Sequence, residues 1–207
     1  MKTCNLKIFD KAQPYSKILR MMQDFTNNRT PETLDEVWLL EHTPVYTYGA
    51  HTKPKIPKVS IPITTTDRGG NITYHGPGQI IIYPLLDTNR LNYNIHDLIE
   101  RLELLTLKLM QQNQLEGHLF PGRRGVYYDN KKIASIGLKF KRYCSYHGLA
   151  INVNLDLEPF QFIKPCGYDQ EVTSLKQAGI NIEIADIKQQ IIPLITKYLA
   201  VKPKELG

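Results

Sequence analysis

Cysteine is scarce in this sequence, and its few cysteines lack the spacing of a disulfide or metal motif. The 207 residues include only three, Cys4, Cys144 and Cys166. They are too few and too scattered for a disulfide framework, and no CxxC pair occurs. The six histidines also lack the short spacings of metal ligands. We therefore expect no metal site, and we expect each cysteine to be either a small buried residue or a reactive thiol.

Long apolar runs are missing as well. The start of the chain, residues 1–7, has no apolar stretch of the length that a signal peptide needs. No segment approaches the roughly 20 apolar residues of a membrane helix. With 42% hydrophobic and 22% charged residues, the composition is that of an ordinary globular protein. We expect a soluble, cytoplasmic monomer without membrane contact, folded as a single domain over residues 1–207.

The chain carries a net charge of +6. Such a charge can attract an acidic partner. We do not expect nucleic acid as the partner, because no recognition-helix motif occurs and the basic residues are dispersed rather than gathered in one stripe. An acidic carrier protein fits the charge equally well, so the charge alone does not identify the partner.

Hydrophobic spacing predicts helices near both ends and in the middle of the chain. A first helix is expected after Pro14, and the clearest helix begins after Asn94, which can cap it. The tail over 184–199 is amphipathic, and we expect Pro193 to kink or split it.

Strand-like segments fill much of the remaining sequence. A short edge strand is expected over 4–9, and the apolar run 80–83 reads as a buried strand. Asp129–Asn130 fits a tight turn between two strands. Further strands are expected over 36–42, 45–48, 125–128, 132–140 and 147–153, with a short helix over 159–163. Because strands dominate the centre and helices flank it without strict alternation, we predict an α+β fold with a central mixed β-sheet flanked by helices.

The first segment that can carry chemistry is Arg68–Gln79, with the sequence RGGNITYHGPGQ. Its glycines let the backbone approach a ligand closely, Arg68 can bind an anion, and His75 can act as an acid or a base. The segment lacks the pattern of a phosphate-binding P-loop.

Lys132 is the second candidate, because it enters a predicted strand, whereas Lys131 has the position of an ordinary surface charge. Side chains alternate along a strand, so Lys132 is expected to share a face with Ala134, Ile136 and Leu138. An ammonium held over such an apolar face would have a lowered pKa and could act as a base near neutrality.

The segment His147–Asn154 alternates apolar and polar residues, as a half-buried strand does. Gly148 in this segment indicates the close approach of a ligand or of a neighbouring backbone. A histidine such as His147 is more often structural than catalytic, and we keep that interpretation ahead of a catalytic one.

Cys166 lies between a proline and a glycine, on a turn from which its sulfur can reach a substrate. A free thiol has a pKa of roughly 8.5, so it needs an electropositive or basic neighbour to ionise at neutral pH. The local sequence leaves open whether Cys166 is an idle loop cysteine or a nucleophile. Cys144, which follows an Arg–Tyr pair, is the alternative nucleophile.

Together these segments resemble the lipoyl (octanoyl) transferases of the cofactor-transferase superfamily, which also contains biotin and lipoate ligases. The likeness is carried in order by RGGNITYHGPGQ at 68–79, KIASIG at 132–137, HGLAINV at 147–153 and PCG at 165–167. It covers most of the chain from Val37 to Leu175, and four ordered motifs are far more specific than any one of them. One departure is Asn71, where the family commonly has glutamine.

The resemblance implies the biotin/lipoate protein ligase-like fold and a two-step acyl transfer without a cofactor. Cys166 would attack the thioester of octanoyl-acyl carrier protein, and a lysine of the acceptor would then take the octanoyl group as an amide. The implied acceptors are the lipoyl domains of 2-oxoacid dehydrogenase complexes and the glycine cleavage H protein. Lys132 matches the family's catalytic lysine, which is expected to lower the pKa of Cys166 and to relay protons.

The resemblance also implies the substrate-binding residues. These are Arg68, Gly69, Gly70, Asn71, Ile72, Thr73, Tyr74, His75, Ser135, Ile136, Gly137, Gly148, Leu149 and Ala150. An octanoyl chain needs a narrow apolar slot, where burial contributes roughly 0.8 kcal/mol per methylene. We expect the N–H donors for the tetrahedral oxyanion near Leu149 or in the turn at Gly69–Gly70.

Two alternatives remain at this point. An ATP-dependent lipoate or biotin ligase on the same fold would need an adenylate site and no catalytic cysteine. A non-catalytic module that binds a carrier protein or a lipoyl domain would keep the basic surface but tolerate the loss of Cys166. The PCG motif at 165–167 favours transfer over both.

Overall fold

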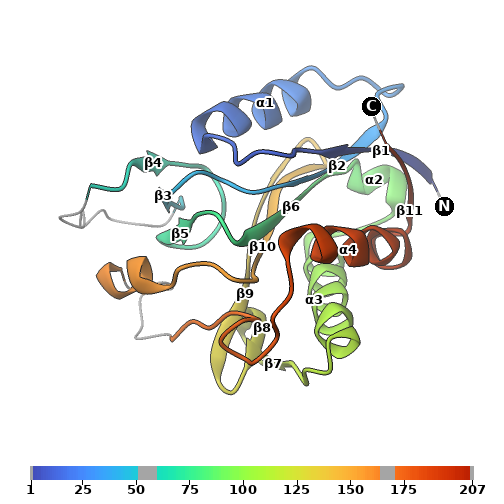
Figure 1. Cartoon of the computed structure of the whole chain (residues 1–207). Helices are drawn as coiled ribbons and strands as arrows, with labels where there is room; N and C mark the ends of the chain where they lie inside the picture. The colour runs from blue at the N-terminus through green and yellow to red at the C-terminus, as the bar shows by residue number, and fades with distance from the viewer. Residues whose placement is uncertain (1, 51–59, 164–170, 206–207) are drawn as a thin grey trace.

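An eight-stranded mixed sheet forms the centre of the protein (Figure 1). The computed structural model describes residues 2–50, 60–163 and 171–205. Across the sheet the strands are, in order, β11 (Val201–Glu205), β1 (Lys2–Ile8), β2 (Asp35–Leu40), β6 (Gln79–Leu85), β10 (Cys144–Asn152), β9 (Lys131–Lys141), β8 (Arg123–Tyr128) and β7 (His118–Phe120). β1 is parallel to both of its neighbours, and the other pairs are antiparallel. The predicted α+β fold with a mixed sheet is confirmed.

A second, three-stranded sheet lies beside the first and carries the chain into the glycine-rich segment. It contains, in order, β4 (Ile63–Thr65), β3 (Val45–Tyr48) and β5 (Thr73–His75). The 3₁₀ helix η1 (Glu158–Phe162) packs against it, and the Tyr46 hydroxyl donates a hydrogen bond to the Pro159 carbonyl at 2.8 Å. A small apolar cluster fills the space between these elements.

Helices cover both faces of the large sheet (Figure 1). α1 (Tyr15–Asn27) packs on one face, where Ile18 and Met22 join Trp38 in a buried cluster. α3 (Ile95–Gln112) and α4 (Ile184–Leu199) pack on the other face and form the larger core, and the short α2 (Thr88–Leu91) precedes α3. None of the helices that the structure describes is long and apolar enough to span a membrane.

Local sequence signals correctly placed several elements. Asn94 caps α3 in a capping box: its side chain accepts from the Asp97 N–H at 3.1 Å, and Asp97 accepts from the Asn94 N–H at 2.7 Å. The predicted turn at Asp129–Asn130 has φ values of 47° and 59°, which suit these two residue types.

At the start of the chain one prediction was wrong, and at Pro193 one of the two expected outcomes, a split helix, is excluded. β1 is not an edge strand, because β11 pairs with it in parallel and forms the edge instead. Pro193 does not split the last helix, since α4 continues through it. The buried side chains of Ile191, Leu194 and Ile195 hold both halves against the core and so compensate for the N–H that proline lacks.

Candidate active site

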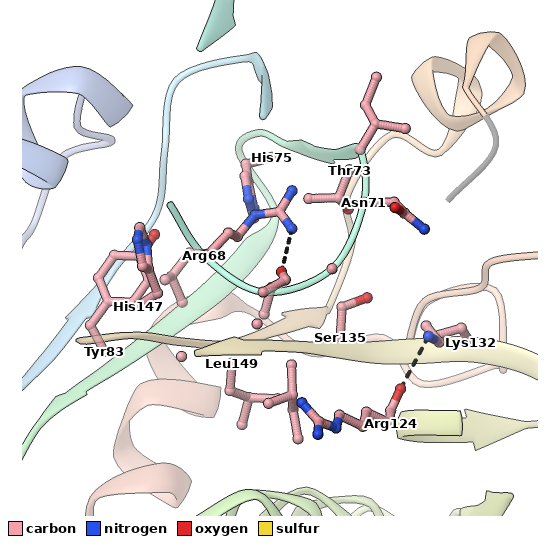
Figure 2. A pocket seen from close by; sticks show the side chains of 18 of the residues that line it. Arg68, Asn71, Thr73, His75, Tyr83, Arg124, Lys132, Ser135, His147 and Leu149 are labelled. Carbon is pink, nitrogen blue, oxygen red and sulfur yellow. Dashed lines mark hydrogen bonds between the residues drawn. The ribbon is translucent and has the colours of Figure 1, made fainter. Parts of the chain in front are cut away.

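A single cavity of about 280 Å³ brings together segments that are far apart in the sequence (Figure 2). Its walls come from the glycine-rich segment between β4 and β5, from the central strands β6, β9 and β10, from the start of β8 and from Tyr15 of α1. The apolar residues that line it include Ile72, Ile81, Ile136, Leu149 and Ala150.

The cavity contains nearly all of the binding residues expected from the sequence. Those that line it are Arg68, Gly69, Gly70, Asn71, Ile72, Thr73, His75, Lys132, Ser135, Ile136, Gly137, Gly148, Leu149 and Ala150. Tyr74 is the exception and corrects the expectation. Side chains alternate along β5, so Tyr74 points away from the cavity and packs between Tyr46 and Phe160 in the small cluster. Cys166 lies outside the described residues.

Lys132 is buried at one side of the cavity, with only 5% of its surface exposed. Its ammonium donates to the Arg124 carbonyl at 3.1 Å and lies 5.3 Å from the centre of the Tyr127 ring. The backbone on both sides of the residue is also fixed: the Lys132 N–H donates to Glu171, and its carbonyl accepts from Thr173, each at 2.9 Å. These two bonds therefore hold Lys132 beside residues 171–173, which follow the segment 164–170.

The strand face predicted for Lys132 was wrong. Val126 pairs with Ala134, but the next residue of β8, Tyr127, pairs with Lys132, so β9 has one extra residue, Ile133, at this point. A bulge of this kind reverses the alternation of side chains along the strand. Consequently Lys132 lines the cavity together with Ser135, whereas Ala134 belongs to the core.

Arg68 braces the glycine-rich segment instead of presenting a free anion site. The side chain is buried, and its guanidinium donates to the Thr47 carbonyl at 2.7 Å and to the Gly69 carbonyl at 3.0 Å. It also donates to the Thr47 hydroxyl at 2.9 Å. The Gly69 N–H in turn donates to the Leu138 carbonyl at 3.0 Å. This bond corrects part of the expectation for the oxyanion donors, because the Gly69 N–H is already used within the protein.

Gly148 is required by the neighbouring strand. A Cβ added at this position would lie 2.1 Å from the Ile82 carbonyl oxygen and 2.6 Å from the ring of Pro84. Of the two explanations given from the sequence, the close approach of backbone is therefore the one that the structure supports.

His147 lies on the opposite side of the cavity from Lys132 (Figure 2). A network of hydrogen bonds holds it there. His147 Nε2 donates to Asp67 Oδ1 at 2.8 Å, and His147 Nδ1 accepts from the Tyr15 hydroxyl at 3.2 Å. The Tyr146 hydroxyl donates to the other oxygen of Asp67. His147 also has a φ of 56°, which is rare for a non-glycine residue inside a strand.

Burial keeps His147 neutral, and the hydrogen bonds keep Asp67 ionised. Burial lowers the pKa of His147, although the Asp67 carboxylate opposes this effect. Burial alone would raise the pKa of Asp67, but the hydrogen bonds from His147 and Tyr146 hold it below its usual value. The structure thus supports the structural interpretation of His147, with the addition that its ring forms part of the cavity wall.

Two further histidines beneath this wall are neutral for the same reason. His42 Nδ1 donates to the Gln13 carbonyl at 2.9 Å and its Nε2 accepts from the Tyr83 hydroxyl at 2.8 Å, and burial lowers its pKa to about 4. Burial, together with the nearby positive charges, lowers the pKa of His75 well below its usual value. His75 Nδ1 bonds to Gln79 at 2.7 Å, while its Nε2 is buried without a hydrogen-bond partner among the described residues. A neutral His75 is a weak base, so the acid–base role considered for it gains no support here.

The sequence analysis missed several residues that border the cavity. Tyr15, Tyr83, Arg123 and Arg124 line the cavity, but each lies outside the recognised motifs. No local signal identified them, since the fold alone brings α1 and the start of β8 to these strands. Within the described parts of the chain, no three histidine, cysteine or acidic side chains are grouped in a way that could hold a metal ion.

The other two cysteines are poor nucleophiles. Cys4 is fully buried in the large core, and burial raises its pKa to about 12. Cys144 does not line the cavity, and burial raises its pKa as well. The alternative nucleophile considered from the sequence, Cys144, is therefore set aside.

With this fold and site, comparison with known proteins defines the class. Residues 14–195 match the family model of the lipoyl protein ligase A/B catalytic domain, and the chain belongs to that family. The curated octanoyltransferase of Chromobacterium violaceum is 40% identical to it over 90% of this chain and 91% of its own length. The octanoyltransferase of Laribacter hongkongensis is 42% identical over 90% of this chain and 91% of its own length.

Solved structures agree with the fold. A bipartite lipoate protein ligase from Thermoplasma acidophilum superposes with a TM-score of 0.79 at 11% identity, over 100% of this chain and 88% of its own. The biotin protein ligase from Aquifex aeolicus, in complex with biotin and ATP, gives a TM-score of 0.63 at 14% identity, over 95% of this chain and 70% of its own. The biotin/lipoate protein ligase-like fold expected from the sequence is confirmed.

Proposed function

We propose that this protein is an octanoyltransferase of lipoate biosynthesis that moves an octanoyl group from octanoyl-acyl carrier protein to a lysine of lipoyl-domain proteins. Its similarity to curated octanoyltransferases over 90% of the chain supports this activity. As acceptors we propose the lipoyl domains of 2-oxoacid dehydrogenase complexes and the glycine cleavage H protein. The proposal includes a monomer that acts in the cytoplasm as one catalytic domain over residues 1–207.

The observation that carries the proposal is the cavity itself, which joins Lys132 to a wall suited to an acyl chain. The apolar side chains and the glycine backbone can bury methylenes, each contributing roughly 0.8 kcal/mol. The Tyr15 and Tyr83 hydroxyls donate to His147 and His42, so their hydrogens are not directed at a ligand. A wall of neutral groups with internal partners can accept an apolar chain without leaving donors unsatisfied.

In the proposed reaction, the Cys166 thiolate attacks the carbonyl of the octanoyl thioester. A new carbon–sulfur bond forms, and the carrier thiol leaves with a proton. The amine of the acceptor lysine then attacks this second thioester, so that an amide forms and the Cys166 thiol is released. Lys132 is assigned to lower the pKa of Cys166 and to relay the protons between amine and thiols. A thioester is exchanged for an amide, so the reaction needs no ATP and no cofactor.

The position of Lys132 supports this assignment in two ways. The residue is buried in the cavity wall, where substrate atoms can reach its ammonium. Its backbone is also paired with Glu171 and Thr173, the first described residues after the segment that contains Cys166. The raised pKa values of Cys4 and Cys144 leave Cys166 as the preferred nucleophile.

The test is to incubate the protein with octanoyl-acyl carrier protein in the absence of ATP and to measure its intact mass. We expect an octanoyl adduct that peptide mapping assigns to Cys166 and that disappears when apo lipoyl domain is added. Cys166→Ser should abolish the thioester adduct, whereas the matched variant Cys144→Ser should retain it. An adduct that survives in Cys166→Ser would refute the assigned nucleophile.

The same assay separates the two alternatives. If a folded protein forms no adduct but lipoylates the domain when ATP and lipoate are supplied, the protein is a ligase. If it binds the carrier and the domain but transfers nothing under either condition, it is a binding module.

A further inference from the structure

The net positive charge of the chain is concentrated in one part of the large sheet. Residues 118–146 contain seven lysines and arginines but only one acidic residue, Asp129, so this stretch alone carries a net charge of +6. The rest of the chain is balanced, with nineteen basic and nineteen acidic residues. The basic residues were expected to be dispersed, and this local excess corrects that expectation. The stretch forms β7, β8 and β9 at one edge of the sheet.

Three of these basic residues lie beside the cavity. Arg123 and Arg124 are exposed and line it, so they lie where the cavity meets the surface. Lys139 is also exposed, and β9 runs antiparallel to β8, which places its second half alongside the start of β8. Burial is the main cause of the lowered pKa of His147, and Asp67 opposes it. The positive charges of Arg68 and Lys139 lower this pKa further. Lys139 pairs with Tyr146 of β10, whose neighbour His147 lines the cavity. We call Arg123, Arg124 and Lys139 the basic rim.

The acidic groups near the rim are engaged elsewhere. Asp67 accepts from His147 and Tyr146, Glu103 accepts from the Gly125 N–H at 2.9 Å, and Glu171 pairs with Lys131. Among the described residues, none of the three rim side chains forms an ion pair with a carboxylate. The rim therefore presents a local excess of positive charge at the opening.

We propose that the basic rim docks an acidic surface of the protein that delivers the acyl group. The inference rests on the proposed function, because the donor must leave its octanoyl chain inside the cavity while the carrier stays outside. The linker between chain and carrier then passes the opening that Arg123 and Arg124 border. Arginine suits this role, since its guanidinium binds carboxylate or phosphate oxygens through two parallel hydrogen bonds.

The physical consequence is faster encounter with an acidic donor. Clustered charge of one sign can raise association rates by about 10- to 1,000-fold at low ionic strength, and salt removes much of the gain because the Debye length is about 10 Å at 0.1 M. Changing two rim arginines to glutamates therefore affects a protein donor much more than a small neutral thioester.

The experiment compares two double variants with the same change in charge. Arg123→Glu/Arg124→Glu alters the rim, and Lys202→Glu/Lys204→Glu alters exposed lysines of β11, at the opposite edge of the sheet. The rate constant of acyl-enzyme formation is measured with octanoyl-carrier protein and with octanoyl-N-acetylcysteamine, at 20 mM and 500 mM salt. Titration calorimetry measures the affinity for the carrier separately, and circular dichroism checks that each variant is folded.

For the rim variant we expect the rate constant with octanoyl-carrier protein, divided by that with the small thioester, to fall by about tenfold or more at low salt. The rate constant with the carrier should also depend less on salt, and the affinity for the carrier should fall to a matching degree. The β11 variant should keep both ratio and affinity close to those of the wild type. An equal loss with both donors would place the arginines inside the reaction site and overturn the proposal. An effect confined to transfer onto the lipoyl domain would assign the rim to the acceptor and also overturn it.

Failure of the proposed function gives a different result. In that case the wild type forms no acyl-enzyme with either donor. Calorimetry still decides the docking question, because carrier affinity that is equal in the wild type and in both variants refutes the rim irrespective of the chemistry.

Discussion

Acidification should destabilise this protein before its carboxylates are protonated, because the wall beneath the cavity contains neutral histidines. His42 is the clearest case, since it is fully buried and both ring nitrogens have partners. Its Nδ1 must donate to the Gln13 carbonyl, so Nε2 is the acceptor for Tyr83. Protonation at Nε2 would place a positive charge in a buried site and force the Tyr83 hydroxyl to turn its hydrogen away.

The size of the effect follows from the pKa. Burial lowers the pKa of His42 from 6.5 to about 4 in the folded state. Between these values the unfolded chain binds a proton that the folded chain does not, so stability is lost as the pH falls from 6.5 towards 4 and levels off below it. From pH 7.5 to pH 4.5 this histidine alone should remove about 2–3 kcal/mol from the free energy of unfolding. His75 and His147, whose pKa values are also lowered, add in the same direction.

Urea unfolding at pH 7.5 and at pH 4.5 measures the loss directly. The variant His42→Gln removes the titrating group. Its stability should therefore change with pH by about 2–3 kcal/mol less than that of the wild type over the same range, even if it is lower throughout. An NMR titration of the His42 ring gives the folded-state pKa independently. A ring that titrates near 6.5 in the folded protein, or a variant with an unchanged pH dependence, would refute the reasoning.

Four further substitutions test other parts of the structure. Lys132→Ala should slow acyl-enzyme formation about a hundredfold or more while the chain stays folded, and near-normal acylation would remove its assigned role. Gly148→Ala should destabilise the protein by about 1–3 kcal/mol in urea unfolding, because the new Cβ meets the Ile82 carbonyl, and an unchanged midpoint would contradict that contact. Arg68→Lys should lose the bonds that brace Gly69 and cost about 2 kcal/mol, whereas equal stability would mean that the brace is dispensable. Asn94→Ala should lower stability by about 1 kcal/mol through loss of the capping box, and a value near zero would show that helix packing alone holds the end of α3.

The sequence determined the elements whose signals are local. The α3 helix combines an Asn94–Asp97 capping box with apolar residues at helical spacing, and both features act within a few residues. The turn at Asp129–Asn130 likewise depends on residue types that tolerate positive φ. The motifs at 68–79, 132–137 and 147–153 indicated the cavity, because small and polar residues are placed together where backbone approaches a ligand or another strand.

Local sequence patterns do not predict which distant segments pair with one another. β11 has the sequence VKPKE, whose proline and two lysines give a weak strand signal, and it pairs as a strand with the edge that β1 offers. The extra residue Ile133 appears in β9 because β8 pairs on both sides of it, and it alone decides that Lys132 faces the cavity with Ser135. Tyr74 shows the same limit, since its membership of a motif did not reveal which face of β5 it occupies.

The chemistry of the site divides in the same way. The motifs identified the lysine, the histidines and the glycines of the site, because the chemical type of a side chain can be read directly from the sequence. Burial and hydrogen-bond partners decided that His42, His75 and His147 are neutral, that Arg68 braces a turn and that Cys4 and Cys144 are protonated thiols. These outcomes depend on which groups the fold removes from water and which partners it supplies, so only the tertiary structure could determine them.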